Sequence, residues 1–226
     1  MKYASDAHHR PSTRLKAYDY ANAGAYFVTI CTQGRECVLD EPVVSGIIAD
    51  VWQSLPGRFA HLALDEFVVM PNHVHMVVWL QPSGGGVRRV QTGRPPFGRP
   101  QLRRDHRSGW IAPTSGQGLD RDWEIPAARI INSTAKLGHV ISAFKSLVIT
   151  VYLDWIHAHQ QMRRASFWQR NYYDHIIRND IELNAIRQYI RDNPTRWELD
   201  RDNPENARSL RPAESATDYV TDAANS

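Results

Sequence analysis

Two apolar segments that are separated by only two residues constrain the fold of this chain most. LALDEFVVM ends at Met70 and HVHMVVWL begins at His73, so Pro71 and Asn72 are the whole connection. Both segments are rich in the β-branched and aromatic residues that favour strands, and Pro and Asn are common turn residues. The sequence therefore predicts an antiparallel β-hairpin over residues 62–80, although Asn-Gly would have been a stronger turn signal.

The flanking segments predict the elements around this hairpin. AYFVTICT at 25–32 is typical of a buried strand, and residues 43–55 place apolar side chains at helical spacing before Pro56 and Gly57 end the helix. A long helix is predicted over 139–159, with possible caps at 132–134, and a short aromatic strand or loop over 167–179. A final helix over 180–193 begins with a capping box formed by Asn179 and Glu182 and ends at Pro194.

This order of elements predicts a fold. Strand, helix, strand, strand, helix and strand match the α+β, ferredoxin-like (split βαβ) fold, an antiparallel sheet with helices on one face. The last helix is then an addition to that core at its C-terminal end. The 226 residues are enough for one such domain with a sizeable core and an appendage.

Composition changes sharply at three places and so predicts the domain limits. Residues 1–22 form a basic N-terminal arm, and 23–198 form the folded domain. Within it, about 81–130 is rich in Gly, Pro and Arg with little apolar periodicity, and we expect a flexible basic insertion there. Residues 199–226 are polar, and we expect a disordered tail.

Composition also limits the class of protein. Hydrophobic residues make up 42% of the chain, but no stretch approaches the roughly 20 apolar residues that cross a bilayer, and the N-terminus lacks an apolar signal core. We therefore expect a cytoplasmic protein with no membrane partner. Cys31 and Cys37 are the only cysteines, which we interpret as reduced thiols, and a four-cysteine zinc site is excluded. The net charge of +3 is a mild bias towards polyanions.

The histidines at the start of the second hairpin strand are the strongest candidates for a functional site. His73 and His75 are two residues apart, so on a strand both imidazoles project from the same face. Two adjacent imidazoles can chelate a divalent ion. The alternative is a pair of half-buried histidines that hydrogen-bond to neighbouring backbone or to a carboxylate.

The final helix carries two further candidates. Tyr189 and Asn193 are four residues apart and share a helix face. Asn193 offers an amide oxygen, which suits a hard ion such as Mg²⁺ or Mn²⁺, but the following Pro194 biases it away from helical geometry. Tyr189 could attack a phosphodiester if a metal ion made the phosphorus more electrophilic. The alternatives are that Tyr189 is a packing residue and that Asn193 is an ordinary helix end.

These segments resemble a known family. VVMPNHVHMVVWL resembles the HUH signature of single-tyrosine transposases, and FWQRNYYDHIIRND followed by IRQYIRDNP resembles the REP-associated tyrosine transposases, a branch of that group. The resemblance covers about 25–197 and is broken by the insertion. It implies an HUH endonuclease domain in which His73 and His75 bind the metal ion, Tyr189 is the nucleophile and Asn193 is a further ligand.

The resemblance also implies a substrate and a reaction. A transposase-like enzyme of this kind cleaves and rejoins single-stranded or hairpin DNA at palindromic repeats through a 5′-phosphotyrosine link, as a monomer or a homodimer. Arginines of the insertion could neutralise phosphates, and Phe97 or Trp110 could stack on a base. Further candidate DNA-binding residues are Arg14, Lys16, Lys145, Arg170 and His175.

Other interpretations of the same residues stay open. The protein could bind hairpins without cutting them, with a vestigial catalytic site. Rolling-circle initiators and relaxases share the histidine pair, although a single late tyrosine after the histidines fits a transposase better. Tyr172 and Tyr173 are adjacent and are second choices for the nucleophile, with aromatic packing as their ordinary role.

Overall fold

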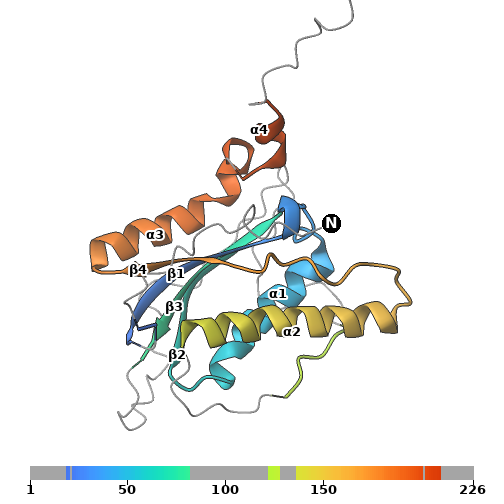
Figure 1. Cartoon of the computed structure of the whole chain (residues 1–226), viewed down its shortest axis with the longest axis horizontal. Helices are drawn as coiled ribbons and strands as arrows, with labels where there is room; N and C mark the ends of the chain where they lie inside the picture. The colour runs from blue at the N-terminus through green and yellow to red at the C-terminus, as the bar shows by residue number, and fades with distance from the viewer. Residues whose placement is uncertain (1–18, 21, 82–121, 128–135, 201, 210–226) are drawn as a thin grey trace, which may run out of the picture.

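A four-stranded antiparallel sheet forms the centre of the protein (Figure 1). The computed structural model describes residues 19–20, 22–81, 122–127, 136–200 and 202–209. The strands lie in the order β2-β3-β1-β4. This order, with one helix between β1 and β2 and another between β3 and β4, confirms the predicted split βαβ fold. The strands are β1 (Gly24–Cys31), β2 (Leu62–Met70), β3 (His73–Leu80) and β4 (Tyr173–Ile177).

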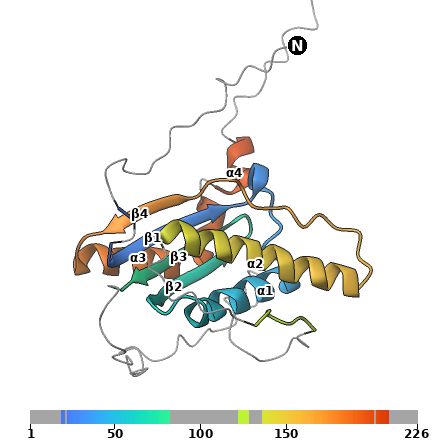
Figure 2. The same ribbon diagram turned by 60° about the horizontal axis from the view of Figure 1, so that its bottom comes forward.

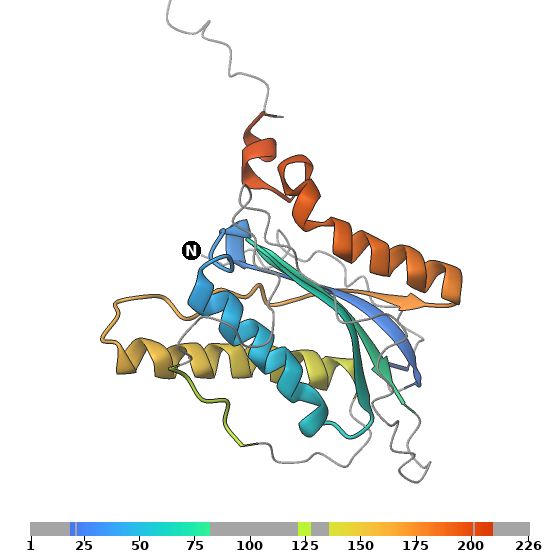
Figure 3. The same ribbon diagram turned by 180° about the vertical axis from the view of Figure 1, so that it is seen from behind.

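Helices cover both faces of this sheet. α1 (Pro42–Ser54) and α2 (Leu137–Ala158) lie over one face, which Figure 2 shows with α2 in front of the strands. α3 (Asp180–Asp192), the added helix, lies over the opposite face, so the view from behind shows the sheet between α3 and the α1–α2 pair (Figure 3). Because side chains alternate along a strand, Tyr26 and Val28 enter the main core, whereas Phe27 faces α3.

The α1–α2 face holds the main hydrophobic core. The apolar residues at helical spacing within 43–55 are buried in it, namely Val44, Ile47, Ile48, Val51, Trp52 and Leu55. By length and composition alone, α2 is apolar enough to cross a membrane, which was not expected from the sequence, but a buried core helix passes the same test. The buried side chains of α2 recur at helical spacing and pack in the core against α1 and the sheet. These residues are Leu137, Val140, Ile141, Phe144, Val148, Val151, Tyr152 and Ile156.

A smaller apolar cluster holds α3 on the other face, where Leu183 and Ile190 pack with apolar residues of all four strands. A register irregularity in β2 between Leu64 and Phe67 makes this docking specific. A bulge lets neighbouring residues of one strand reach the same side, so Asp65 and Glu66 both bind α3. Asp65 accepts hydrogen bonds from Arg187 (Nε, 2.8 Å) and Trp79, and Glu66 accepts from Arg191 (Nε, 2.9 Å).

Two predicted flexible regions include ordered residues. Residues 122–127 lie within the expected insertion, yet Trp123 packs against the main core and approaches Gly46 so closely that a Cβ there would lie 2.9 Å from its ring. The expected disordered tail contains α4 (Pro204–Ser209) and the buried Asn203. Single apolar or amide side chains dock these residues on the fold, and such contacts leave no local periodicity in the sequence.

The helix ends confirm the predicted cap of α3 and show the conformation of Asn193. Asn179 Oδ1 accepts from the Glu182 backbone N–H at 2.9 Å, which is the cap predicted for α3. Asn193 keeps right-handed helical angles (φ −52°, ψ −47°) despite the following proline. α2 begins after Lys136, which makes no side-chain cap, and the caps predicted at 132–134 lie outside the described residues.

Candidate metal and phosphodiester site

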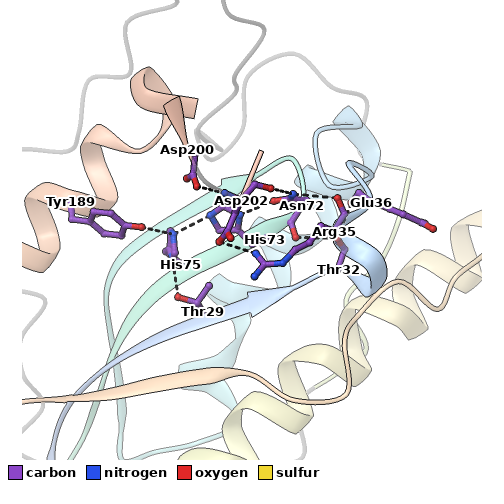
Figure 4. Close-up of polar contacts among 10 residues, drawn as sticks. All are labelled: Thr29, Thr32, Arg35, Glu36, Asn72, His73, His75, Tyr189, Asp200 and Asp202. Atoms are coloured by element: carbon purple, nitrogen blue, oxygen red, sulfur yellow. Dashed lines mark hydrogen bonds and ion pairs between the residues drawn. The ribbon is translucent and has the colours of Figure 1, made fainter. Parts of the chain in front are cut away.

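The hairpin brings its two histidines together on the face that α3 covers. His73 and His75 lie at the start of β3, and their Nε2 atoms are 3.0 Å apart. Both side chains are buried, at 0% and 4% exposure. Figure 4 shows the two rings next to each other, with the Tyr189 phenol pointing at His75 from the side. The predicted pairing of the imidazoles on one strand face is therefore present.

Asn72, in the hairpin turn, fixes the hydrogen position of His73. Its Nδ2 donates to the backbone oxygens of Asp202 (2.7 Å) and Arg35 (3.2 Å), so its Oδ1 is the acceptor that faces His73. His73 Nδ1 lies 2.8 Å from that oxygen and must carry the proton (Figure 4). His73 Nε2 therefore presents a lone pair towards His75.

Thr29 supports the second histidine from the neighbouring strand. It is the direct partner of His75 in the β1–β3 pairing, and its Oγ1 lies 2.8 Å from His75 Nδ1. A hydroxyl can donate or accept, so it satisfies Nδ1 in either tautomer. Phe27 stacks on the same imidazole, with ring centroids 5.3 Å apart, and limits its rotation.

The surroundings keep both rings uncharged at neutral pH. Burial lowers the pKa of His73 to about 4, although the nearby carboxylates of Asp200 and Asp202 act in the opposite direction. Burial, helped by His73 and Arg35, also lowers the pKa of His75 well below its usual value. Neutral imidazole is the form that binds metal ions, so the pair is ready to ligate near neutral pH.

The two nitrogens fit adjacent positions on one octahedral ion. Ligands about 2.1 Å from such an ion and at right angles lie about 3.0 Å apart, which matches the Nε2 separation. Within the described part of the chain, no group of three or more His, Cys, Asp and Glu side chains could hold a metal ion.

Asn193 stays a predicted ligand. It is buried at the end of α3, and its Nδ2 donates to the Tyr189 backbone oxygen at 3.0 Å, which leaves Oδ1 as its available ligand atom. The contacts described for its side chain lie within its own helix, and none of them reaches His73 or His75.

Tyr189 lies directly beside the histidine pair. Its phenol oxygen is 3.4 Å from His75 Nε2, and its ring meets the His75 ring with centroids 5.3 Å apart (Figure 4). The side chain is 47% exposed, so solvent and a ligand can reach the phenol. The fold therefore joins the two predicted halves of the site, which are 114 residues apart in the sequence.

The candidate DNA-binding residues lie in different places. Lys145 is half-buried on α2 and donates to the backbone oxygens of Gln169 and Arg170, so it anchors the segment before β4. Arg170 is exposed, and His175 pairs with Glu182 at 2.6 Å. Arg14 and Lys16, and Phe97 and Trp110 of the insertion, lie outside the described residues.

The rival tyrosines have separate environments. Tyr172 packs against the main core, as expected for an aromatic packing residue. Tyr173 is 46% exposed on β4 and meets Phe27 edge-on, with centroids 6.4 Å apart. None of the described ring contacts or hydrogen bonds joins either of them to His73 or His75.

The supporting residues escaped prediction from the sequence. The alternation of β1 places Phe27 and Thr29 on one face, but only the strand register shows that this face meets the histidines. Asn72 was identified as a turn residue, without its role in orienting His73. Asp202 lies in the segment expected to be disordered, although its backbone oxygen accepts from Asn72.

Comparison with known proteins gives one sequence relative and nine similar chains among solved structures, two of which are described below. No protein-family profile matches the chain. An uncharacterized protein of Haemophilus influenzae is 29% identical over 207 residues, which cover 88% of this chain and 96% of that protein.

Both structures share 15% sequence identity with this chain. A REP-associated tyrosine transposase bound to a REP hairpin has a TM-score of 0.44 and covers 95% of this chain and 97% of its own. A protein from Deinococcus radiodurans, provisionally named a transposase, has a TM-score of 0.37 and covers 79% and 95%. Structural similarity this low supports no argument about function, so the function is inferred from the site itself.

Proposed function

We propose that this protein is a transposase-like, metal-dependent endonuclease that cleaves and rejoins single-stranded or hairpin DNA. One observation carries the proposal: an accessible phenol, Tyr189, lies 3.4 Å from the Nε2 atom of one of two paired, neutral histidines. A buried structural pair of histidines has no need of an exposed tyrosine beside it. A phosphodiester placed between them would meet a nucleophile and a metal site together.

The reaction is a transesterification. The phenol oxygen of Tyr189 attacks phosphorus, the bond from phosphorus to the 3′ oxygen breaks, and a 5′-phosphotyrosine link and a free 3′-OH result. The phenol proton leaves to solvent, which reaches the half-exposed side chain, and the departing 3′ oxygen takes up a proton. Attack by another 3′-OH on the phosphotyrosine reverses the step and joins strands.

His73 and His75, with Asn193 as the predicted third protein ligand, would hold one Mg²⁺ or Mn²⁺ ion. The ion would supply electrophilic activation of the phosphate and stabilise the departing oxygen. The protein holds its ligand nitrogens through Asn72 and Thr29, and it holds Tyr189 through the docking of α3.

Hairpin-forming palindromic repeats are the proposed substrate. The support is the resemblance of the HVHMVVWL and IRQYIRDNP segments to REP-associated tyrosine transposases. We place the activity in the cytoplasm, where such repeats would be reached.

Replacing Tyr189 with Phe tests the nucleophile directly. The change removes one oxygen and keeps the ring that contacts Phe27 and His75, so the fold and hairpin affinity should persist. Incubation with labelled hairpins and Mn²⁺ should give a covalent adduct with the unchanged protein and none with Tyr189→Phe. Tyr173→Phe is the matched control and should keep activity within about tenfold, which is roughly 1.4 kcal/mol in the barrier.

The same assay separates the competing interpretations. Replacing His73 and His75 together with Ala should abolish the adduct but leave hairpin binding. An adduct that maps to the peptide with Tyr172 and Tyr173 would reassign the nucleophile. Hairpin binding without any adduct, in the presence of metal, would favour a DNA-binding protein with a vestigial site.

A further inference from the structure

A shallow hollow opens beside the proposed nucleophile, between α3 and the edge strand β4. Its volume is about 350 Å³, and Figure 1 shows β4 running beneath α3 where it lies. Tyr189, whose phenol oxygen lies 3.4 Å from His75 Nε2, forms one of its walls, so the hollow adjoins the histidine site. It is lined by Phe27, Tyr173, His175, Glu182, Ala185, Ile186 and Tyr189.

The hollow exists because α3 docks to one side of the sheet. Arg187 and Arg191 bind Asp65 and Glu66 of β2, and the helix contacts β2 and β3. On its other side, Ile186 and Tyr189 line the hollow together with Phe27 of β1. Tyr173 of β4, on the opposite wall, is 46% exposed.

The rings of the hollow suit a flat ligand. Phe27 lies between the two tyrosines and meets each edge-on, with centroids 6.4 Å from Tyr173 and 6.1 Å from Tyr189. Exposed aromatic rings are the usual platforms on which unpaired bases stack, and each such stack contributes about 1–3 kcal/mol.

The polar wall of the hollow can meet the edge of such a ligand. His175 Nε2 and Glu182 Oε1 lie 2.6 Å apart, and Glu182 Oε2 also accepts from the Arg178 backbone N–H at 2.8 Å. These contacts hold the carboxylate in place at the start of α3. A carboxylate oxygen accepts more than one hydrogen bond, so Glu182 can also accept from the amino group of a base.

We propose that this hollow binds one unstacked nucleobase of the DNA strand, next to the phosphate that Tyr189 attacks. The inference rests on the proposed function. A phosphate at the Tyr189 phenol is covalently joined to a nucleotide on each side, and the hollow is the aromatic space that shares Tyr189 as a wall. Tyr173 is then a base-binding residue that fixes which phosphate reaches the nucleophile.

The test is a coupling measurement in the Tyr189→Phe protein, which binds but does not cut. A single abasic site is moved along a labelled single-stranded hairpin, and affinity is measured at each position with Tyr173 and with Tyr173→Ala. At one position the abasic site should weaken binding about tenfold when Tyr173 is present. Tyr173→Ala should weaken binding of intact DNA about tenfold and should abolish the effect of that abasic site.

Matched variants distinguish the loss of a base contact at Tyr173 from a general change in the fold. Tyr173→Phe keeps the ring and should restore the coupling, and Ile181→Ala, which alters an exposed α3 residue outside the hollow, should change neither value. If Tyr173→Ala does not fold, Ala185→Trp fills the hollow instead and should also abolish the coupling. Abasic profiles that are the same with and without the Tyr173 ring would overturn the proposal.

The outcome is independent of the test for cleavage. An absent adduct in the active protein refutes the proposed reaction, whereas the coupling is measured without any cleavage. If an adduct forms but no abasic position couples to Tyr173, the proposed nuclease activity stands and the proposed base site is refuted.

Discussion

The hydroxyl of Thr29 can serve His75 in two proton arrangements. Without a cation, His75 Nε2–H donates to the lone pair of His73 Nε2 at 3.0 Å, and Thr29 donates to His75 Nδ1 at 2.8 Å. With a cation, both Nε2 atoms need their lone pairs, so His75 carries its proton on Nδ1 and Thr29 accepts. Asn72 Oδ1 can only accept, so His73 keeps one tautomer throughout.

Thr29→Val should therefore weaken metal binding without unfolding the protein. Valine keeps the shape of the side chain but leaves His75 Nδ1 without a partner, and losses of such supporting contacts typically cost 10–100-fold in metal affinity. Titration calorimetry with Mn²⁺ measures the effect. Thr29→Ser keeps the hydroxyl and should stay close to the unchanged protein, and equal affinity in all three proteins would refute this role.

At the scale of elements, the placement of Tyr189 depends on how α3 docks. Asp65 sits at the irregularity of β2 and accepts from both Trp79 and Arg187, with its own side chain 10% exposed. Burial alone would raise the pKa of Asp65, but the hydrogen bonds from Arg187 and Trp79 outweigh it and lower the pKa below 3.8. The ionised carboxylate thus stabilises the folded state.

Asp65→Asn should lower the free energy of unfolding by about 2 kcal/mol at pH 7, the usual scale for hydrogen bonds to a charged group. A lowered folded pKa contributes stability above the unfolded pKa, and this is lost as pH falls through the folded pKa. The difference from the unchanged protein should therefore shrink below about pH 4. Chemical unfolding at pH 7 and pH 3 measures both values.

Glu66→Gln, which removes the charge of the neighbouring ion pair with Arg191, is the control for Asp65→Asn. Its partner Arg191 is half exposed, and pairs of that kind contribute about 1 kcal/mol or less. Equal losses in the two variants, or a loss for Asp65→Asn that does not depend on pH, would contradict a special role of Asp65 in docking α3.

At the scale of the whole molecule, distant parts of the chain converge on the histidines. Asp202 binds Arg35 through its carboxylate (2.8 Å) and Asn72 through its backbone, so the segment after α3 returns to the hairpin turn (Figure 4). Both borders of the long insertion are also held: Gln81 N–H donates to His61, and Asp122 accepts from Trp155.

Deleting 84–118 and joining the ends with a short Gly-Ser linker should leave a folded domain, because both borders bind the fold and the deleted sequence has little apolar periodicity. The deletion removes seven arginines, Arg88, Arg89, Arg94, Arg99, Arg103, Arg104 and Arg107. Hairpin affinity should fall and its salt dependence should become shallower if these arginines meet phosphates. Thermal unfolding and affinity at several salt concentrations provide the test, and loss of cooperative unfolding would show that the insertion is structural.

The sequence by itself determined the features that follow from backbone periodicity. The period of a strand puts His73 and His75 on one face, and the period of a helix puts Tyr189 and Asn193 one turn apart. The order of elements determined the split βαβ fold in the same way, although the residues before the last helix were predicted as a strand or a loop and only pairing with β1 defines β4.

Only the tertiary structure decided what meets at the site. Thr29 faces His75 because of the β1–β3 register, and Tyr189 reaches His75 because α3 docks on the bulged β2. Asp202 supports Asn72 from a segment without any periodic pattern. Local spacing is fixed by the geometry of one backbone segment, whereas register and docking depend on which distant surfaces bury each other, and no single segment contains that information.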